Sequence, residues 1–243
     1  DRADIILAGA VVVDAVMEAG DFSELEATQA GLREGVFFET LLDGHDPPLF
    51  DDVRRDGVRN LAAQHHPDLV HPRHVAALCL EMWDALAAAK VHKGSPEERD
   101  LLWAAAMLHD IGVAVDYDDH HKHSRYLVLN AGLPGFSTRE TGLIGQMVRY
   151  HRKGTPTVGE FEALCRSGDE ALVARCSALL RVAEQLERGR DQHVQRTEVD
   201  VENGSVELAL HAEGDASLAR LSAARAADVF ERAFGKKLTI VGG

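Results

Sequence analysis

Several histidine and carboxylate side chains lie on the predicted helix faces that are directed at the protein core. Each position extends a run of apolar residues spaced three or four apart, which is the pattern of one helix face. His71 precedes such a run, whereas His109, His151 and Glu184 each follow one. Asp110 comes directly after His109. The pattern indicates four helices that each point a possible metal ligand inwards, with a carboxylate beside one of them.

The residue types in this set suit a divalent transition metal, which binds imidazole nitrogens and carboxylate oxygens. The neighbouring His109 and Asp110 can place a bridging carboxylate beside an imidazole ligand. A single histidine on an apolar face is more often a core residue with satisfied hydrogen bonds. Four such positions on successive helices, one of them in the turn 107–112, favour a metal site instead.

The middle of the chain predicts the helices that would position these side chains. Ser95–Glu98 and Ser137–Glu140 each fit a capping box, in which a serine and a glutamate satisfy backbone amides of the first turn. Gly94 and Gly189 mark helix ends. Helices are predicted over residues 51–64, 72–92, 96–110, 120–130, 138–151 and 169–188.

The first part of the sequence does not look able to fold alone. It predicts a helix over residues 2–18, a short strand over residues 25–29 and a helix that reaches residue 42. A single strand has no partner, and its unpaired backbone groups would be costly if buried. We therefore expect residues 1–44 to belong to a larger domain and His45–Pro48 to form a turn or linker.

The last part of the sequence changes to the alternation of polar and apolar residues that is typical of strands. Residues 195–200 and 206–211 alternate in this way, and Asn203–Gly204 between them is a hairpin signal. A helix over residues 217–234 and a strand over residues 237–241 follow. These elements predict a small ββαβ appendage.

Composition and charge exclude several classes of protein. A net charge of −14 argues against binding to duplex nucleic acid, whose affinity comes from neutralised phosphates. No apolar run approaches the roughly 20 residues that span a bilayer, so we expect no membrane association. The three cysteines have no metal or redox spacing, which is typical of core thiols in a reducing cytoplasm.

Several stretches resemble a known family once the histidines are taken in order. His71, His109–Asp110, His120 and His151 resemble the ligand series of HD-superfamily phosphohydrolases. His120, His121 and His123 compete for one ligand role, and we favour His120 because it lies four residues before Ser124, where the superfamily has a small residue. More narrowly, the chain resembles the C-terminal half of the exopolyphosphatase/guanosine pentaphosphate phosphohydrolase family, in residues 31–36, 104–112, 120–126, 148–153, 180–188 and 229–236.

This resemblance implies a fold and a division into domains. The fold is expected to be mainly α, with an HD-type helical domain and the small ββαβ appendage. Residues 1–44 would be the C-terminal remnant of an actin-like α/β domain. The helical domain would span residues 45–194, and the appendage residues 195–243.

The resemblance also implies an activity, cofactors and partners. The family releases terminal phosphate from polyphosphate or guanosine pentaphosphate in a cleft between two actin-like domains. This sequence has no glycine-rich phosphate loop, so catalytic residues are not assigned to it. The chain would serve as a substrate-channel and dimer module, with magnesium used by the full enzyme, a transition metal at the HD site and a homodimer as the assembly.

Two departures bear on whether the HD site is active. Glu184 stands where the superfamily most often has aspartate, which lengthens the ligand arm. Val113 stands where many active HD enzymes have lysine, which removes one possible phosphate contact. The metal ligands that the resemblance implies are His71, His109, Asp110, His120, His151 and Glu184.

A basic cluster is the main positive feature of this acidic chain. It can be a solvated helix end, where cations favour the helix dipole. It can also guide an anionic phosphate chain, because guanidinium groups match phosphate oxygens and the surrounding negative charge would repel the polymer elsewhere. The candidate substrate-binding residues are Lys122, His123, Arg125, Arg149, Arg152 and Lys153.

Three functional hypotheses remain open on the sequence. The first is a part of an exopolyphosphatase-like hydrolase whose chemistry lies in another domain. The second is a free-standing metal-dependent HD phosphohydrolase that acts on a nucleotide or phosphomonoester. The third is a metal-free helical regulatory domain.

Overall fold

A computed structural model describes residues 2–25, 31–65, 68–202 and 204–242. The chain divides into two units, residues 1–51 and 52–243. The first unit holds a short 3-10 helix, η1 (Arg2–Ile5), and two α-helices, α1 (Ile6–Gly20) and α2 (Leu32–Leu41). Neither α1 nor α2 has a buried residue. The strand predicted over residues 25–29 falls, apart from Leu25, outside the described residues. The larger domain expected for residues 1–44 therefore stays a prediction.

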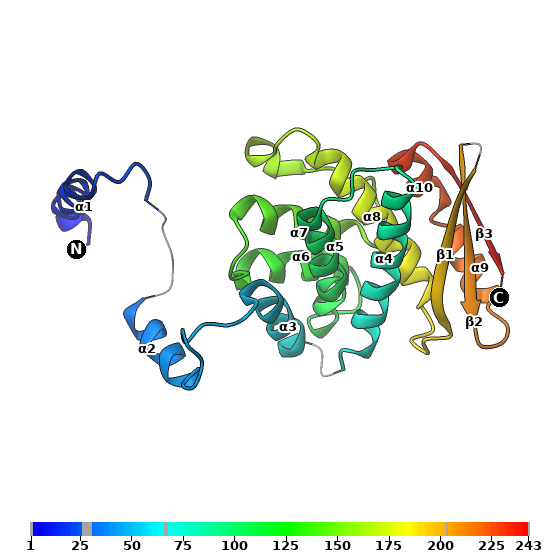
Figure 1. The fold of residues 1–243 in the computed structure, drawn as a ribbon, viewed down its shortest axis with the longest axis horizontal. Helices are drawn as coiled ribbons and strands as arrows, with labels where there is room; N and C mark the ends of the chain where they lie inside the picture. Colours follow the sequence, from blue (N-terminus) through cyan, green and yellow to red (C-terminus); the bar gives the residue numbers. More distant parts are fainter. Residues whose placement is uncertain (1, 26–30, 66–67, 203, 243) are drawn as a thin grey trace. The chain divides into compact units, whose positions relative to one another are not determined.

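The second unit begins with helices that pack around one central helix (Figure 1). All residues of α5 from Leu101 to Leu108 are buried, which requires partners on every side of that helix. Among these partners are α3, α4, α7 and α8. The α-helices are α3 (Val53–His65), α4 (Val70–Ala88), α5 (Pro96–Leu108), α6 (His120–Ala131), α7 (Thr138–Tyr150) and α8 (Asp169–Leu186), and the 3-10 helices are η2 (Ile111–Ala114) and η3 (Gly159–Leu164).

Two helix starts form as the capping boxes predict. The Ser95 side chain accepts a hydrogen bond from the Glu98 amide at 3.2 Å, and α5 begins at Pro96. Ser137 and Glu140 cap each other at the start of α7. Both starts matter for the site, because the opposite ends of α5 and α7 carry candidate metal ligands.

A glycine allows the turn after α5 to lie against the start of α6. A Cβ atom at Gly112 would lie 2.3 Å from both the His120 carbonyl oxygen and the Ser124 amide nitrogen. The Gly112 amide instead donates to the Ser124 hydroxyl at 2.8 Å. This close approach brings the His109–Asp110 segment beside the first turn of α6.

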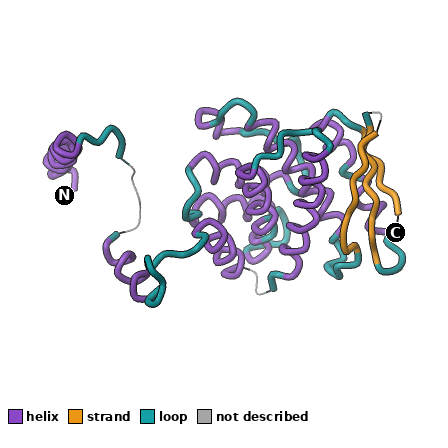
Figure 2. The backbone as a smooth tube through the Cα atoms, in the orientation of Figure 1, coloured by secondary structure: helices purple, strands orange, loops and turns teal. Residues whose placement is uncertain are grey.

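A three-stranded sheet lies at one end of this unit, at the C-terminal part of the chain (Figure 2). The strands are β1 (Val194–Glu202), β2 (Ser205–Ala212) and β3 (Lys237–Gly242), in that spatial order. β1 and β2 are antiparallel, as the hairpin signal predicts, and β2 and β3 are parallel.

The single helix predicted over residues 217–234 is wrong in detail, because it forms two helices, α9 (Ser217–Ala224) and α10 (Ala227–Phe234). No glycine or proline announces the break. The chain tightens there through bonds from the Arg225 amide to Ser222 at 3.1 Å and from the Ala226 amide to Ala223 at 2.9 Å. The appendage is therefore ββααβ, and α9 and α10 both pack against α8 and β3. No helix among the described residues is long and apolar enough to cross a membrane.

Candidate metal centre

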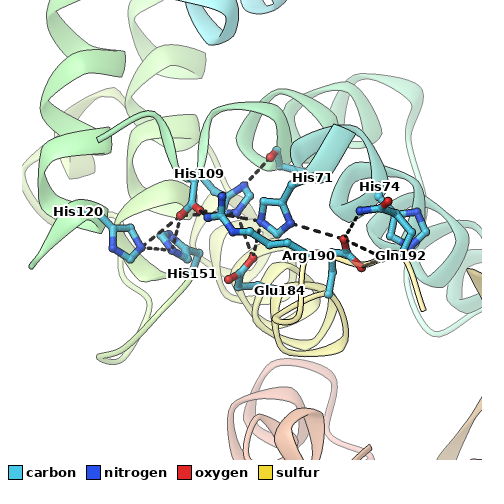
Figure 3. Close-up of polar contacts among 11 residues, drawn as sticks. His71, His74, His109, His120, His151, Glu184, Arg190 and Gln192 are labelled. Atoms are coloured by element: carbon cyan, nitrogen blue, oxygen red, sulfur yellow. Dashed lines mark hydrogen bonds and ion pairs between the residues drawn. The ribbon is translucent and has the colours of Figure 1, made fainter. Parts of the chain in front are cut away.

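Five side chains that the sequence singled out, His71, His109, His120, His151 and Glu184, lie together in the helical unit (Figure 3), and Asp110 lies within 4 Å of four of them. They come from helix ends rather than from helix middles. His71 lies in the first turn of α4 and His120 begins α6, whereas Glu184 lies in the last turn of α8. His109 directly follows α5 and His151 directly follows α7. Asp110 follows His109, so that all six candidate ligands gather in one cluster.

One side of the cluster is formed by His71, His109, Asp110 and Glu184. Glu184 Oε2 lies 3.2 Å from His71 Nε2 and 3.1 Å from His109 Nε2. Asp110 Oδ2 lies 3.9 Å from His71 Nε2, and Asp110 Oδ1 lies 3.7 Å from His109 Nε2. The first three residues are buried and offer ligand atoms within 4.8 Å of one another.

The other side of the cluster is formed by Asp110, His120 and His151. Asp110 Oδ1 lies 3.2 Å from His120 Nε2 and 3.8 Å from His151 Nε2. The Nε2 atoms of His120 and His151 are 3.1 Å apart. These three residues also offer ligand atoms within 4.8 Å of one another, so Asp110 belongs to both groups. A carboxylate in this place can bridge two ions.

Backbone carbonyls fix the orientation of three imidazole rings. The Nδ1 atom of His109 lies 2.7 Å from the Ala106 oxygen, and that of His151 lies 2.7 Å from the Val148 oxygen. His120 Nδ1 makes the same kind of contact with Tyr117 at 2.9 Å. A carbonyl only accepts, so each Nδ1 carries a proton and each Nε2 points at the cluster, as metal-binding histidines require.

Several buried polar atoms in the cluster have no hydrogen-bond partner within the described part of the chain. They are Asp110 Oδ1 and both ring nitrogens of His71. Because such atoms are costly to leave unsatisfied, they fit a bound cation well. The Nε2 atoms of His120 and His151 also fit a bound cation. Their lone pairs face each other, and this arrangement requires a positive charge between them.

Burial and neighbouring charges shift the pKa values of the clustered side chains in different directions. Burial opposes a charge on His109, yet the carboxylates of Asp110 and Glu184 outweigh it and raise the pKa of His109 to about 9. Burial, together with the charge on nearby His109, lowers the pKa of His151 to about 3. Burial would raise the pKa of Glu184, but its hydrogen bond to His109 and its close contact with His71 bring it well below its usual value. Without a metal, a proton on His109 therefore provides the positive charge that balances the two carboxylates. A bound metal ion would provide that charge instead.

A cavity of about 380 Å³ opens onto the cluster. Its wall combines four of the candidate ligands, namely Asp110, His120, His151 and Glu184, with three arginines. The arginines are Arg152, Arg188 and Arg190, and Arg190 makes an ion pair with Asp110. The wall is completed by Val113, Tyr117 and Gln185.

The structure separates most of the basic cluster from this cavity. Lys122 and Lys153 both pair with Asp119, the latter at 3.0 Å, and Arg125 pairs with Glu160. Arg149 lies over the Tyr150 ring at 5.7 Å, and His123 is half-buried on α6. Of the six residues, Arg152 alone lines the cavity, where its guanidinium lies 5.9 Å from the centre of the Tyr117 ring.

Sequence reasoning missed Arg188 of the cavity wall, and it also missed Glu187 and Arg190 beside the candidate ligands. Glu187 is fully buried, and its carboxylate lies 3.7 Å from His71 Nδ1 and accepts hydrogen bonds from the Gln192 amide and side chain. Its place three residues after Glu184 on the same helix face is a signal that could have found it. Arg190 gives no such signal, because a left-handed turn at φ 56° sets the course of the chain there.

Comparison with known protein families shows which family the chain belongs to. The sequence profile of a family described as Ppx/GppA phosphatase, domain III, matches residues 53–221, which is more than half of the chain. The chain belongs to the Ppx/GppA phosphatase family. The resemblance found in the sequence is thereby confirmed. The matched region contains all six candidate metal ligands together with Arg190.

Curated Ppx/GppA relatives are similar at a moderate level. A guanosine-5'-triphosphate,3'-diphosphate pyrophosphatase of Pseudoalteromonas translucida is 28% identical over 187 residues, which are 75% of this chain and 35% of the relative. A protein of the same description from Vibrio vulnificus is 26% identical over 215 residues, which are 88% of this chain and 39% of the relative. The chain thus spans little more than a third of the length of these relatives.

Proposed function

We propose that this chain is the substrate-binding C-terminal part of a phosphohydrolase that removes terminal phosphate from guanosine pentaphosphate or polyphosphate. The family membership and the description of the relatives support this activity. The matched regions make up 35% and 39% of these relatives, so the proposal assigns no catalytic residue of the main reaction to this chain. Its substrate-channel role and a homodimeric assembly are part of the proposal.

The observation that carries this proposal is the cavity at the cluster, where metal ligands and arginines face the same space. Carboxylates alone would repel a phosphate group. A bound divalent cation reverses the local charge, and the three arginines then offer donors that match phosphate oxygens. The combination fits a site for a phosphate group rather than for a neutral ligand.

The residues present fit a divalent transition metal, and the cluster offers two places for one. His71, His109, Asp110 and Glu184 would hold one ion, and Asp110, His120 and His151 would hold a second. A metal held there would supply a Lewis acid for a phosphoryl oxygen. The protein itself orients the imidazoles through the carbonyls of Ala106, Tyr117 and Val148, and keeps the ligands buried.

Metal analysis and phosphate titration test the proposal together. Chain purified without chelator should contain a transition metal near stoichiometric level, and His109→Ala should lose it. His123→Ala is the matched control, because His123 is half-buried on α6 outside the ligand set. Calorimetry with inorganic phosphate should show binding that chelator treatment removes. A metal-free chain that binds no phosphate would leave the third hypothesis, a helical regulatory domain.

A second candidate function is hydrolysis of a phosphate ester or phosphate anhydride by this domain itself. Asp110 supports it, because one carboxylate shared by two ligand groups is the arrangement that two-ion hydrolases use. The chain should then hydrolyse p-nitrophenyl phosphate or polyphosphate in the presence of Mn²⁺, and Asp110→Ala should abolish that activity. Under the first proposal, the chain shows little or no hydrolysis while phosphate binding persists.

A further inference from the structure

A cavity of about 740 Å³ is lined by the turn that follows α4 and by the start of α8. Its wall includes three cationic residues, Lys90, Lys93 and Arg175, and one residue with a carboxylate, Glu98. An excess of positive charge around a cavity is unusual in a chain whose net charge is −14. The wall therefore points to an anionic ligand.

Two helices separate this cavity from the candidate metal ligands. His71 lies in the first turn of α4, whereas Lys90 and Lys93 follow the end of that helix. Glu184 lies in the last turn of α8, whereas Gly168, which lines the cavity, directly precedes its start. With 19 residues, α4 is about 28 Å long. The cavity and the metal ligands thus lie at opposite ends of both helices.

The cations of this wall lack ion-pair partners within the described ranges of the chain. This holds for Lys90, Lys93 and Arg175 alike. The Nε atom of Arg175 is also buried without a hydrogen-bond partner. Asp169, the first residue of α8, pairs with Arg139 instead. Because a buried donor without a partner is costly, the guanidinium group is suited to a bound anion.

His92 adds a hydrogen-bond acceptor to the cavity wall. It is 8% exposed, and its Nε2–H donates to the Trp83 carbonyl at 3.1 Å. The ring packs against the Trp83 ring with 4.0 Å between centroids. Burial, together with the positive charge of Arg175, lowers the pKa of His92, so the ring is neutral at pH 7. Its Nδ1 atom is therefore an acceptor, and it has no partner among the described residues.

These groups place two demands on a ligand. Ammonium and guanidinium donors match the oxygens of a phosphate group, and the positive end of the α8 dipole adds to them. The Nδ1 atom of His92 and the carboxylate of Glu98 accept hydrogen bonds, so they match hydroxyl groups. The cavity volume, about 740 Å³ compared with about 380 Å³ at the metal ligands, leaves room for both kinds of group in one molecule.

We propose that this cavity, called the α4–α8 cavity below, binds a phosphomonoester that carries free hydroxyl groups, such as a sugar phosphate. The phosphate would lie among Lys90, Lys93 and Arg175, and one hydroxyl group would donate to His92 Nδ1. The site uses no metal ion and none of the candidate metal ligands. The proposal therefore does not depend on the proposed function.

Calorimetry with glycerophosphate and propyl phosphate tests the ligand class. Both are phosphomonoesters, but only glycerophosphate has free hydroxyl groups. Chelator is present throughout, so that a metal ion at the candidate ligands does not contribute. Glycerophosphate should bind roughly tenfold more tightly, because propyl phosphate leaves the buried acceptor unpaired. Equal affinities of the parent chain for the two ligands would overturn the proposed ligand class.

Lys93→Glu tests where the phosphate binds. Lys93 is exposed, so the variant should keep the fold. It should weaken the binding of both ligands by about tenfold or more, because an attractive charge becomes a repulsive one. Lys237→Glu is the matched control, because it makes the same change at an exposed lysine of β3 outside this cavity. Equal glycerophosphate affinity in the two variants would overturn the proposal.

His92→Phe tests the role of the acceptor. Phenylalanine can keep the packing against Trp83 but offers no lone pair. The affinity for glycerophosphate should fall to about that for propyl phosphate, which itself should not change. Urea unfolding checks that the variant is folded, and the comparison of Lys93→Glu with Lys237→Glu still tests the site if it is not. A preference for glycerophosphate that persists in folded His92→Phe would overturn the role of Nδ1.

Discussion

Arg190 makes an ion pair with Asp110 through the oxygen that also faces His71, 3.9 Å from its Nε2 atom. Asp110 is 5% exposed at its side chain, whereas the guanidinium-bearing side chain of Arg190 is 43% exposed. An exposed cation from the turn after α8 thus neutralises the buried carboxylate that both ligand groups share. Arg190 and a metal ion would draw on the same carboxylate, so we expect the two to compete for Asp110.

The first prediction follows from this competition. Arg190→Ala should raise the affinity for Mn²⁺ several-fold, because the ion no longer displaces a guanidinium. The same change should destabilise the metal-free chain by about 1 kcal/mol, since a partly exposed partner of a buried carboxylate is lost. Calorimetry and urea unfolding measure the two effects, with Arg59→Ala as the control. Unchanged or weaker metal binding in Arg190→Ala would mean that the two do not compete.

A second prediction concerns Glu187, whose carboxylate lies 3.7 Å from His71 Nδ1. This contact favours the proton on Nδ1 and leaves Nε2 free for a metal. Glu187→Gln should lower metal affinity by about 10- to 100-fold, the usual effect of losing such an outer partner. Glu170→Gln, an exposed change on the same helix, should have no effect. If both variants bind metal equally well, Glu187 is only a structural acceptor for Gln192.

The third prediction is that metal binding depends on pH through His109. The pKa of His109 is raised to about 9, so the ring carries an extra proton at pH 7 that a bound metal must expel. The apparent affinity should therefore rise with pH, by up to about tenfold per unit between pH 6 and 8. His151 should add nothing to this slope, because its pKa is lowered to about 3. Calorimetry in two buffers of different ionisation enthalpy counts the released proton, and a flat profile would contradict the assignment.

The fourth prediction concerns the turn that brings α5 and α6 together. Gly112→Ala would place a methyl group 2.3 Å from the His120 carbonyl oxygen and the Ser124 amide nitrogen. Backbone atoms cannot give way as a flexible side chain can, so the free energy of unfolding should fall by at least about 2 kcal/mol. Metal affinity should fall too, since His120 moves away from Asp110. Gly9→Ala is the control, because no atom lies within 4 Å of the added methyl group.

The sequence predicted those features of the fold that depend on short-range patterns. Helix starts at Pro96 and Thr138 follow from capping boxes, and the hairpin of β1 and β2 follows from Asn203–Gly204 between alternating residues. The break between α9 and α10 was not predictable in this way. It is made by tight backbone bonds at Arg225 and Ala226, and the sequence there keeps a good helical composition.

Helical periodicity alone singled out His71, His109, His151 and Glu184 as possible metal ligands, because it shows which face of a helix turns inwards. It could not determine what surrounds them, since distances between helices depend on packing across the whole unit. Tertiary structure decided that Asp110 lies between two ligand groups, that Arg190 reaches it from a left-handed turn, and that Lys122 and Lys153 are neutralised by Asp119. It also brought Lys93 and Arg175, 82 positions apart by their numbers, to the wall of one cavity. Local patterns fix the direction of a side chain, whereas its partners come from contacts between distant segments.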